Sequence, residues 1–179
     1  MKNRSHEIVW SGMFIALSVV LTRFASIRIP IGGVESIRIG FGTLPIMVSG
    51  ILLGPWVGGT VGALADIIGF AISPMGPYFP HFTLTSALYG LLPGLFLQLF
   101  PSPTREKRVV WGIIITQVFV GGLLTPYFLH AIFHIPWQLL LFPRLFTVPI
   151  HIVIYSLLSL STLRVPLPVT LARNVQGRS

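Results

Sequence analysis

Cysteine is absent from this chain of 179 residues, and charged side chains are scarce. Without cysteine the protein forms no disulfide, carries no thiolate nucleophile and offers no sulfur ligand to a metal. Only 9% of the residues are Asp, Glu, Lys or Arg, whereas a soluble domain carries roughly a quarter. So little charge does not cover a water-facing surface of ordinary size, and 53% of the residues are hydrophobic. We therefore predict an integral membrane protein whose apolar surface faces lipid.

Motifs for catalysis are also missing. The chain has no Gly-x-x-x-x-Gly-Lys phosphate loop, no pair of carboxylates and no Ser-His-Asp set. We therefore expect no enzyme activity and no cofactor. His130 and His134 are spaced four residues apart, as on one face of a helix, but no acidic or cysteine ligand accompanies them. We expect these histidines to line a polar cavity or the membrane interface rather than to bind a metal.

Six apolar stretches are long enough, or nearly so, for the roughly 20 residues that a membrane-spanning helix needs. They cover residues 8–24, 39–53, 56–73, 82–100, 109–133 and 140–163. The second is short, and the sixth contains two prolines. The fold class expected from these stretches is an all-α integral membrane bundle of six transmembrane helices, forming a single domain over residues 1–179.

Lys and Arg in the connections between these stretches predict the orientation. With the N-terminus in the cytoplasm, eight basic residues fall in cytoplasmic segments and four lie at or near the outer side. The eight are Lys2, Arg4, Arg105, Lys107, Arg108, Arg164, Arg173 and Arg178, and the four are Arg23, Arg28, Arg38 and Arg144. We expect both termini in the cytoplasm and a multi-pass protein of the cell membrane. This distribution also explains most of the net charge of +8 without a nucleic-acid partner.

Small residues recur at helical spacing, where they allow close contact between membrane helices. Gly12 and Ala16 form such a pair in the first stretch, which serves either packing within the bundle or docking of a separate membrane subunit. A longer stripe of Gly and Ala occupies positions 58, 62, 65 and 69 of the third stretch. Packing within the bundle is the expected role of this stripe.

Ionisable groups inside a membrane segment need a partner, water or a ligand. Asp66 is the one acidic residue within an apolar stretch, and it either pairs with a nearby arginine or contacts a polar ligand. Arg23, Arg38 and Arg144 cluster toward the outer ends of their stretches, where each either extends to the headgroups or meets a ligand. With Glu35 and Asp66 as their candidate partners, the surplus positive charge favours an anionic ligand, since guanidinium groups bind carboxylates in a bidentate manner.

The connection over residues 74–83 is rich in proline and aromatic residues. Its three prolines and one glycine predict a stiff, non-helical segment. We expect Tyr78, Phe79 and Phe82 at the outer surface. There they form either part of an interfacial aromatic belt or a preorganised platform that stacks on a flat heterocycle.

Several motifs, in order along the chain, resemble the folate-type substrate-binding (S) components of energy-coupling factor (ECF) transporters. They are Ser36-Ile-Arg-Ile-Gly-Phe41, Leu44-Pro45, Gly54-Pro55, Gly62-Ala-Leu-Ala-Asp66-Ile-Ile-Gly69, Tyr78-Phe-Pro-His-Phe-Thr-Leu84 and Pro143-Arg144 with Pro149. The resemblance implies a six-helix fold with both termini inside. It also implies high-affinity binding of a vitamin, by this resemblance folate, from the outer side, and assembly with a membrane coupling protein and two ATPase subunits.

The resemblance also assigns residues to sites. Three arginines would meet carboxylate or polar edges of the ligand, three aromatic side chains would enclose the flat pterin, and a threonine and an aspartate would form hydrogen bonds beside them. These are Arg23, Arg38 and Arg144, then Tyr78, Phe79 and Phe82, then Thr83 and Asp66. Gly12 and Ala16 would contact the coupling protein.

Two positions depart from the family pattern, which often has glycine in place of His81 and threonine in place of Met75. These departures keep other ligands open, among them pantothenate, riboflavin or a queuosine precursor bound by the same architecture. A stand-alone small membrane transporter is the alternative from a different class. Such a transporter would take up its substrate without any ATPase partner.

Overall fold

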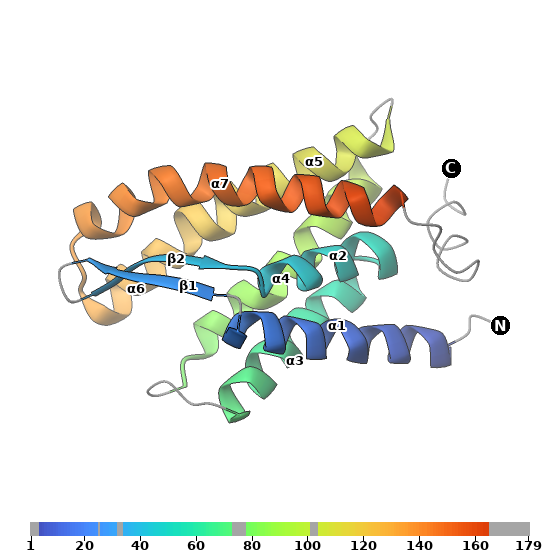
Figure 1. Cartoon of the computed structure of the whole chain (residues 1–179), viewed down its shortest axis with the longest axis horizontal. Helices are drawn as coiled ribbons and strands as arrows, with labels where there is room; N and C mark the ends of the chain where they lie inside the picture. The colour runs from blue at the N-terminus through green and yellow to red at the C-terminus, as the bar shows by residue number, and fades with distance from the viewer. Residues whose placement is uncertain (1–3, 25, 32–33, 73–77, 101–103, 165–179) are drawn as a thin grey trace.

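The computed structural model describes the backbone of residues 4–24, 26–31, 34–72, 78–100 and 104–164 (Figure 1). Within these ranges the description leaves out the side chains at positions 4, 23, 26–31, 34–39, 163 and 164. The elements are α1 (Arg4–Phe24), β1 (Ser26–Ile31), β2 (Val34–Gly40), α2 (Thr43–Leu53), α3 (Pro55–Ile72), α4 (Pro80–Leu99), α5 (Arg105–Thr116), the π-helix η1 (Gln117–Leu124), α6 (Thr125–Phe133) and α7 (Trp137–Arg164).

Within the described ranges, five helical segments are long and apolar enough to cross a membrane. They are α1, α3, α4, the continuous segment formed by α5, η1 and α6, and α7, and they overlap five of the six predicted stretches. The remaining stretch, residues 39–53, corresponds to α2. This helix has 11 residues and is about 16 Å long, roughly half the thickness of the hydrocarbon core of a bilayer.

The helical prediction does not extend to residues 26–40, which form an antiparallel β-hairpin that the sequence analysis did not anticipate. The sequence carries the signal, because isoleucine occupies every second position from 27 to 31 and again positions 37 and 39. This period of two is that of a β-strand. The strands pair from Ser26 opposite Gly40 up to Ile29 opposite Ile37, and the register shifts before Pro30, which has no N–H to donate.

Glycines bring α2, α3 and α4 into backbone contact. A Cβ on Gly90 would lie 2.0 Å from the carbonyl oxygen of Gly58, and one on Gly50 would lie 1.9 Å from the carbonyl oxygen of Gly90. A Cβ on Gly62 would lie 2.1 Å from the carbonyl oxygen of Ser86. These distances are far below van der Waals contact, so only residues without a side chain allow the helices to approach this closely. The glycines of the α3 stripe thus pack inside the bundle, as predicted.

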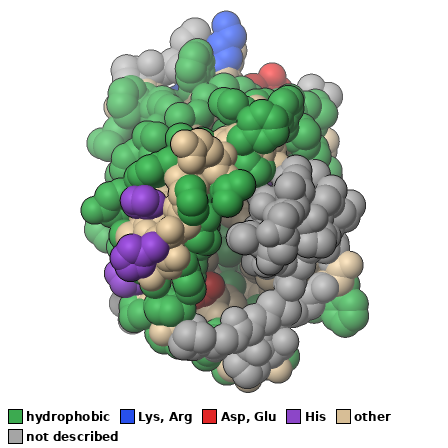
Figure 2. Space-filling model, turned by 90° about the vertical axis from the view of Figure 1, so that its left-hand side faces the viewer, with side chains coloured by type: hydrophobic (Ala, Val, Ile, Leu, Met, Phe, Trp, Pro, Cys, Tyr) green, Lys and Arg blue, Asp and Glu red, His purple; other side chains and the backbone are tan. Residues whose placement is uncertain are grey.

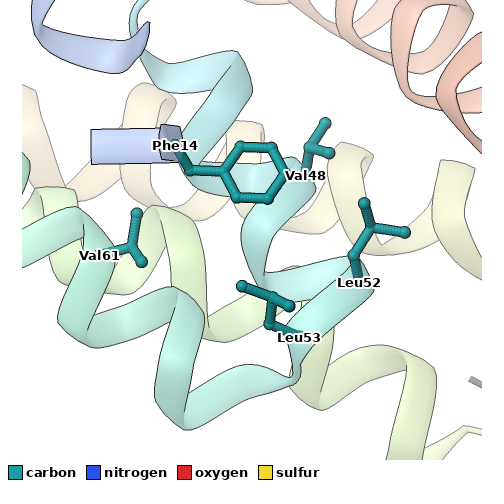
Figure 3. Close-up of a cluster of buried hydrophobic side chains, with 5 residues drawn as sticks. All are labelled: Phe14, Val48, Leu52, Leu53 and Val61. Carbon is teal, nitrogen blue, oxygen red and sulfur yellow. The ribbon is translucent and has the colours of Figure 1, made fainter. Parts of the chain in front are cut away.

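Helix α2 lies at the centre of the bundle, with every residue from Pro45 to Leu53 buried. One cluster of buried side chains joins it to α1 and α3 (Figure 3), and it consists of Phe14, Val48, Leu52, Leu53 and Val61. A second cluster joins it to α5 and α7, and it consists of Met47, Ile51, Val109, Ile113 and Tyr155. The largely apolar and uncharged sequence of α2 therefore reflects burial in protein on all sides.

Large apolar side chains cover the outside of the bundle. On α7, for example, Leu145 is 69% exposed and Phe146 is 58% exposed. Contiguous apolar surface of this kind is rare on soluble monomers and suits contact with lipid.

The elements divide between two ends of the bundle (Figure 1). Helix α1 begins and α7 finishes at one end, on the right of Figure 1, and the β-hairpin lies at the other. We call the second the hairpin end; it also contains the turn between α6 and α7. Strand β2 packs against α7, and β1 lies beside α1. The hairpin thus sits between the first and last helices of the chain.

Candidate ligand-binding site

A chain of hydrogen bonds links three of the predicted site residues. The Thr83 hydroxyl donates to Oδ2 of Asp66 over 2.6 Å, and the Tyr78 hydroxyl oxygen lies 2.6 Å from Thr83 Oγ1. A threonine hydroxyl has one hydrogen, and a carboxylate only accepts. Because Thr83 uses its hydrogen on Asp66, Tyr78 is the donor to Thr83. The chain leaves the second carboxylate oxygen, Oδ1, as a further acceptor.

The packing of α3 against α4 produces this contact. The two helices run in opposite directions, and Gly62 of α3 meets the backbone of Ser86 on α4. One helical turn closer to the end of α3 and to the start of α4, Asp66 faces Thr83. The glycine contact therefore sets the distance at which an aspartate and a threonine, far apart in the sequence, share a hydrogen bond.

Aromatic rings surround the hydrogen-bonded chain. The Tyr78 ring lies 5.2 Å from that of Phe70 at an interplanar angle of 58°. Phe79 contacts Phe82 at 6.3 Å and Phe133 at 5.2 Å, both edge to face. The rings of Phe79 and Phe82 are nearly perpendicular, at 83°. The three predicted aromatic residues therefore lie near one another but do not form one flat surface.

A second polar cluster surrounds Gly121 in η1. Arg144 of α7 donates from Nη1 to the Gly121 carbonyl oxygen. A Cβ on Gly121 would lie 2.8 Å from the Tyr89 hydroxyl and 3.1 Å from Oε1 of Gln117. Side chains from α4, η1 and α7 thus converge on this glycine. In the described part of the chain, no ion pair joins Arg144 to Asp66, so the two predicted residues belong to separate networks.

The π-helix that carries Gly121 has a local cause in the sequence. Pro126 stands in the first turn of α6, where it lacks an N–H and its ring conflicts with the carbonyl group four residues earlier. The helix widens over the preceding residues, and the Thr125 hydroxyl donates to the Val120 carbonyl five residues back over 2.7 Å. π-Helical turns frequently occur at functional sites. This segment was not predicted, although Gly121-Gly122 followed by Pro126 was the available signal in the sequence.

Two side chains anchor the hairpin and the turn that follows it to the helices, and neither contact was predicted from the sequence. Tyr155 of α7 donates from its hydroxyl to the carbonyl oxygen of Gly40, the last residue of β2. Ser18 of α1 donates to the carbonyl oxygen of Gly42 over 2.7 Å. A Cβ on Gly42 would lie 1.8 Å from Thr22 Oγ1, so this turn requires glycine. These contacts join residues up to 115 positions apart, so no local sequence pattern predicts them.

The histidines have structural contacts. His130 Nδ1 lies 2.8 Å from the carbonyl oxygen of Ile135, and its ring packs on Trp137 at 4.6 Å. His134 has a left-handed backbone with φ of 53° and ends α6. Both residues therefore shape the turn between α6 and α7. Across the described residues, no three His, Asp or Glu side chains gather in a way that would hold a metal ion.

Figure 2 shows the hairpin end, where few charged side chains are visible among the described residues. Hydrophobic side chains cover most of its described surface, and histidine side chains gather at one side. Among the described side chains of this end, a ligand would meet mainly apolar and aromatic walls, as in most small-molecule sites.

Comparison with known proteins identifies the family. A family model described as "ECF-type riboflavin transporter, S component" matches residues 2–172 of this chain. The chain belongs to this family. Its members are transporter components rather than enzymes, in agreement with the lack of catalytic motifs. Family membership and the five long apolar helices make the chain a multi-pass membrane protein.

The descriptions of two relatives of this S component mention the vitamin folate. The Folate transporter FolT of Clostridium novyi (strain NT) is 39% identical over 114 residues, which are 64% of this chain and 62% of that protein. The match thus spans less than two thirds of the relative. A crystal structure of FolT bound with folic acid has a TM-score of 0.70 at 27% identity and covers 85% of this chain and 89% of that chain.

A second solved structure, described as the S component of a bacterial ECF transporter, supports the fold. It has a TM-score of 0.64 at 17% identity and covers 90% of this chain and 95% of that chain.

The remaining predicted site residues of this S component lie apart from the two polar clusters or outside the described side chains. The side chains of Arg23 and Arg38 are outside the description, although the backbone register places Arg38 opposite Arg28 in the hairpin. Gly12 and Ala16 are exposed on α1, and a Cβ on Gly12 would meet no atom within 4 Å. Neither residue is used in packing within the bundle.

Proposed function

We propose that this chain is the folate-binding S component of an ECF-type importer of the cell membrane. The observation that carries the proposal is the likeness, over 85% of the chain, to FolT in its folic-acid-bound structure. The 39% identity to the Folate transporter FolT of Clostridium novyi supports the same ligand. The family description names riboflavin instead, so riboflavin is the ligand against which folate has to be tested.

Charge favours folate over riboflavin. Folate carries carboxylates on its glutamate end, whereas riboflavin is uncharged. Arg144 has four further N–H donors beyond the one used on Gly121, and these suit a carboxylate. The hairpin backbone sets Arg28 opposite Arg38, a pairing of like charges that is unfavourable without an anion nearby. An anionic ligand at the hairpin end would satisfy these arginines, and Arg23 would join them from the end of α1.

The hydrogen-bonded chain suits the other end of folate. The pterin ring presents N–H groups, and Oδ1 of Asp66 is an acceptor for them while Oδ2 is held by Thr83. Tyr78, Phe79 and Phe82 would enclose the ring from several directions rather than as one stacked platform, because Phe79 and Phe82 are nearly perpendicular. In this arrangement Thr83 orients the carboxylate and Tyr78 completes the wall.

The membrane topology is also part of the proposal. We propose that α2 completes six passes, the short helix being shielded on all sides by protein, and that the hairpin end faces outward. The common end of α1 and α7 then lies in the cytoplasm, as the distribution of basic residues predicts. Uptake requires a membrane coupling protein and two ATPase subunits, and the exposed Gly12 and Ala16 of α1 belong to the docking surface for the coupling protein.

Ligand binding is tested on the purified protein in detergent, after unfolding and refolding to remove any co-purified ligand. Tryptophan fluorescence is titrated separately with folate and with riboflavin. We expect saturable quenching by folate at sub-micromolar concentration and none by riboflavin in the same range. Saturable quenching by riboflavin and not by folate would show that riboflavin is the ligand. Failure of both on a folded sample would reject the ligand-site assignment.

A pair of threonine variants tests the site itself. Thr83→Val removes the hydroxyl that joins Asp66 to Tyr78, and a hydrogen bond to a charged group contributes about 1.5–3 kcal/mol, so we expect folate to bind about tenfold more weakly or worse. Thr85→Val is the matched control, because Thr85 bonds only to the local Phe82 carbonyl on the same helix. Equal affinities of the two variants would contradict the role of Thr83.

Uptake is measured in proteoliposomes, with and without the coupling protein and the ATPase subunits. We expect folate to accumulate only when the complete module and ATP are present. Accumulation by the chain alone would make it a stand-alone transporter.

A further inference from the structure

Gln117 is a buried polar side chain that the ligand contacts proposed above do not include. It is the first residue of η1 and is 2% exposed. Its amide offers two N–H donors and one carbonyl acceptor, and buried groups of this kind are nearly always paired. Within the described part of the chain, no hydrogen bond joins this amide to another residue. The fold therefore leaves donor and acceptor capacity unused inside the bundle.

The Gln117 amide belongs to the same polar cluster as Arg144. The Arg144 guanidinium donates to the carbonyl oxygen of Gly121. A Cβ on Gly121 would lie 3.1 Å from Oε1 of Gln117 and 2.8 Å from the Tyr89 hydroxyl. The tips of three polar side chains thus meet around one glycine. Arg144 also retains N–H groups beyond the one that it uses on Gly121.

A second unpaired group lies along α7 from Arg144. His151 follows Arg144 by seven residues, which places both on the same face of the helix. It is close enough for the charge of Arg144 to act on its ring. Its Nε2 is buried and has no hydrogen-bond partner among the described residues. Unpaired polar groups on two helices indicate that a polar molecule completes this cluster.

We propose that Gln117 is a ligand-binding residue that pairs with the amide between the aminobenzoyl and glutamate parts of folate. The inference rests on the proposed function, which supplies the ligand. The nitrogen of this amide is bonded to the carbon that carries one of the two carboxylates. A residue that binds the amide therefore belongs beside an arginine that binds the carboxylate, which is how Gln117 stands to Arg144. Oε1 of Gln117 accepts from the ligand N–H.

The contact predicts which part of the ligand Gln117 recognises. 6-Hydroxymethylpterin keeps the pterin ring, for which Asp66 and Tyr78 are proposed, but it lacks the amide and the glutamate. A change at Gln117 should therefore alter the affinity for folate and leave the affinity for 6-hydroxymethylpterin unchanged. An ordered water in place of the ligand amide would satisfy Gln117 equally well, but it would not produce this difference between the two ligands.

The test compares two glutamine-to-methionine variants, purified in detergent and stripped of ligand. Methionine has a similar length without the amide. Gln98→Met is the matched control, because Gln98 is exposed near the end of α4. In fluorescence titrations we expect Gln117→Met to bind folate about tenfold more weakly or worse, and 6-hydroxymethylpterin as the wild type does. Gln98→Met should change neither. Equal folate affinities of the two variants, or equal losses for both ligands, would overturn the proposal.

The stability of the ligand-free protein separates a binding role from a structural one. Methionine replaces an unpaired buried amide by an apolar group of similar volume, so we expect the Tm of ligand-free Gln117→Met to stay constant or rise. Thermal unfolding is followed by intrinsic fluorescence. A lower Tm than that of the wild type would show that the amide stabilises the fold and would overturn the proposal.

A charge at the same position gives a second measure of the site. Gln117→Glu keeps the shape of the side chain and an acceptor oxygen, but it places a negative charge beside the proposed carboxylate position. We expect folate to bind about a hundredfold more weakly or worse, because like charges then meet in a poorly hydrated site. Folate affinity at the wild-type value would place the glutamate end of folate elsewhere and overturn the proposal.

The outcomes distinguish this inference from the proposed function. Wild-type protein that binds no folate would refute the proposed function, and the contact at Gln117 with it. Wild-type protein that binds folate, together with a Gln117→Met variant that binds it equally well, would refute the contact at Gln117 alone.

Discussion

The contact between Gly90 and Gly58 makes a quantitative prediction about the stability of the bundle. A Cβ on Gly90 would lie 2.0 Å from the Gly58 carbonyl oxygen and 2.4 Å from its carbonyl carbon. Ordinary contact begins at 3.4 Å, so α3 and α4 must separate by about 1.4 Å to accept alanine. Backbone atoms meet here, and no side-chain rotation relieves the clash.

The energetic cost of separating the helices is offset in part by the higher helix propensity of alanine. Alanine is about 1 kcal/mol better than glycine in a helix interior. Overpacking a well-packed interior costs typically about 1–3 kcal/mol and occasionally more. Moving α3 away from α4 also disturbs the contact between Gly62 and Ser86, which lies one helical turn from the hydrogen bond between Asp66 and Thr83. Because two backbones clash here, the cost lies at the upper end of this range, about 3 kcal/mol. We therefore expect Gly90→Ala to destabilise the protein by about 2 kcal/mol net, which lowers the Tm by about 4–8 °C for a chain of this size.

Gly12→Ala is the matched control, because it makes the same chemical change in a helix interior with no atom within 4 Å of the new Cβ. Thermal unfolding of both variants is followed by intrinsic fluorescence in the same detergent. We expect the Tm to fall for Gly90→Ala and to stay constant or rise for Gly12→Ala. A Tm for Gly90→Ala that equals or exceeds that of Gly12→Ala would refute the backbone contact as the packing determinant.

Other substitutions test the second polar cluster and the hairpin. Arg144→Gln removes the guanidinium that donates to the Gly121 carbonyl. We expect folate to bind about tenfold more weakly or worse, with riboflavin as the comparison ligand. Unchanged folate affinity would exclude Arg144 from the site. Tyr155→Phe leaves the Gly40 carbonyl without this buried donor, at a cost of about 1–3 kcal/mol. We expect faster amide hydrogen exchange in β2, while Tyr127→Phe, at an exposed position, should leave exchange unchanged.

The helices were predictable because their signal is local. Apolar stretches of about 20 residues have few alternatives to a membrane-spanning helix, and five of the six predicted stretches coincide with such helices. The hairpin was not predicted, because its strands have only six and seven residues, and alternation over so short a segment is a weaker signal than an apolar stretch of about 20 residues. The stretch over residues 39–53 was predicted as a short span, and the burial of residues 45–53 of α2 shows that its apolar character reflects a central position in the bundle.

The candidate site was predictable only in part. Asp66 stands out in the sequence because a carboxylate within a membrane segment needs a polar partner or a ligand. Tyr78 stands out because it lies in a proline-rich connection with other aromatic residues. Their connection through Thr83 depends on how close two antiparallel helices come, which the Gly62 contact decides. The sequence left open whether Asp66 pairs with an arginine or contacts a ligand. The structure shows that Arg144 donates to the Gly121 carbonyl, and the side chains of Arg23 and Arg38 lie outside the description.

Composition and local pattern by themselves determined that this chain is a membrane protein, which segments are apolar enough to cross a membrane and which residues carry charge within them. The physical reason is that the transfer of each residue between water and lipid depends on the residue and its immediate neighbours. Tertiary structure alone decided which polar groups meet, where backbones touch and that the Gln117 amide is buried beside Gly121. These features depend on sub-ångström fit between segments distant in sequence, and in lipid that fit, rather than water, holds the helices together.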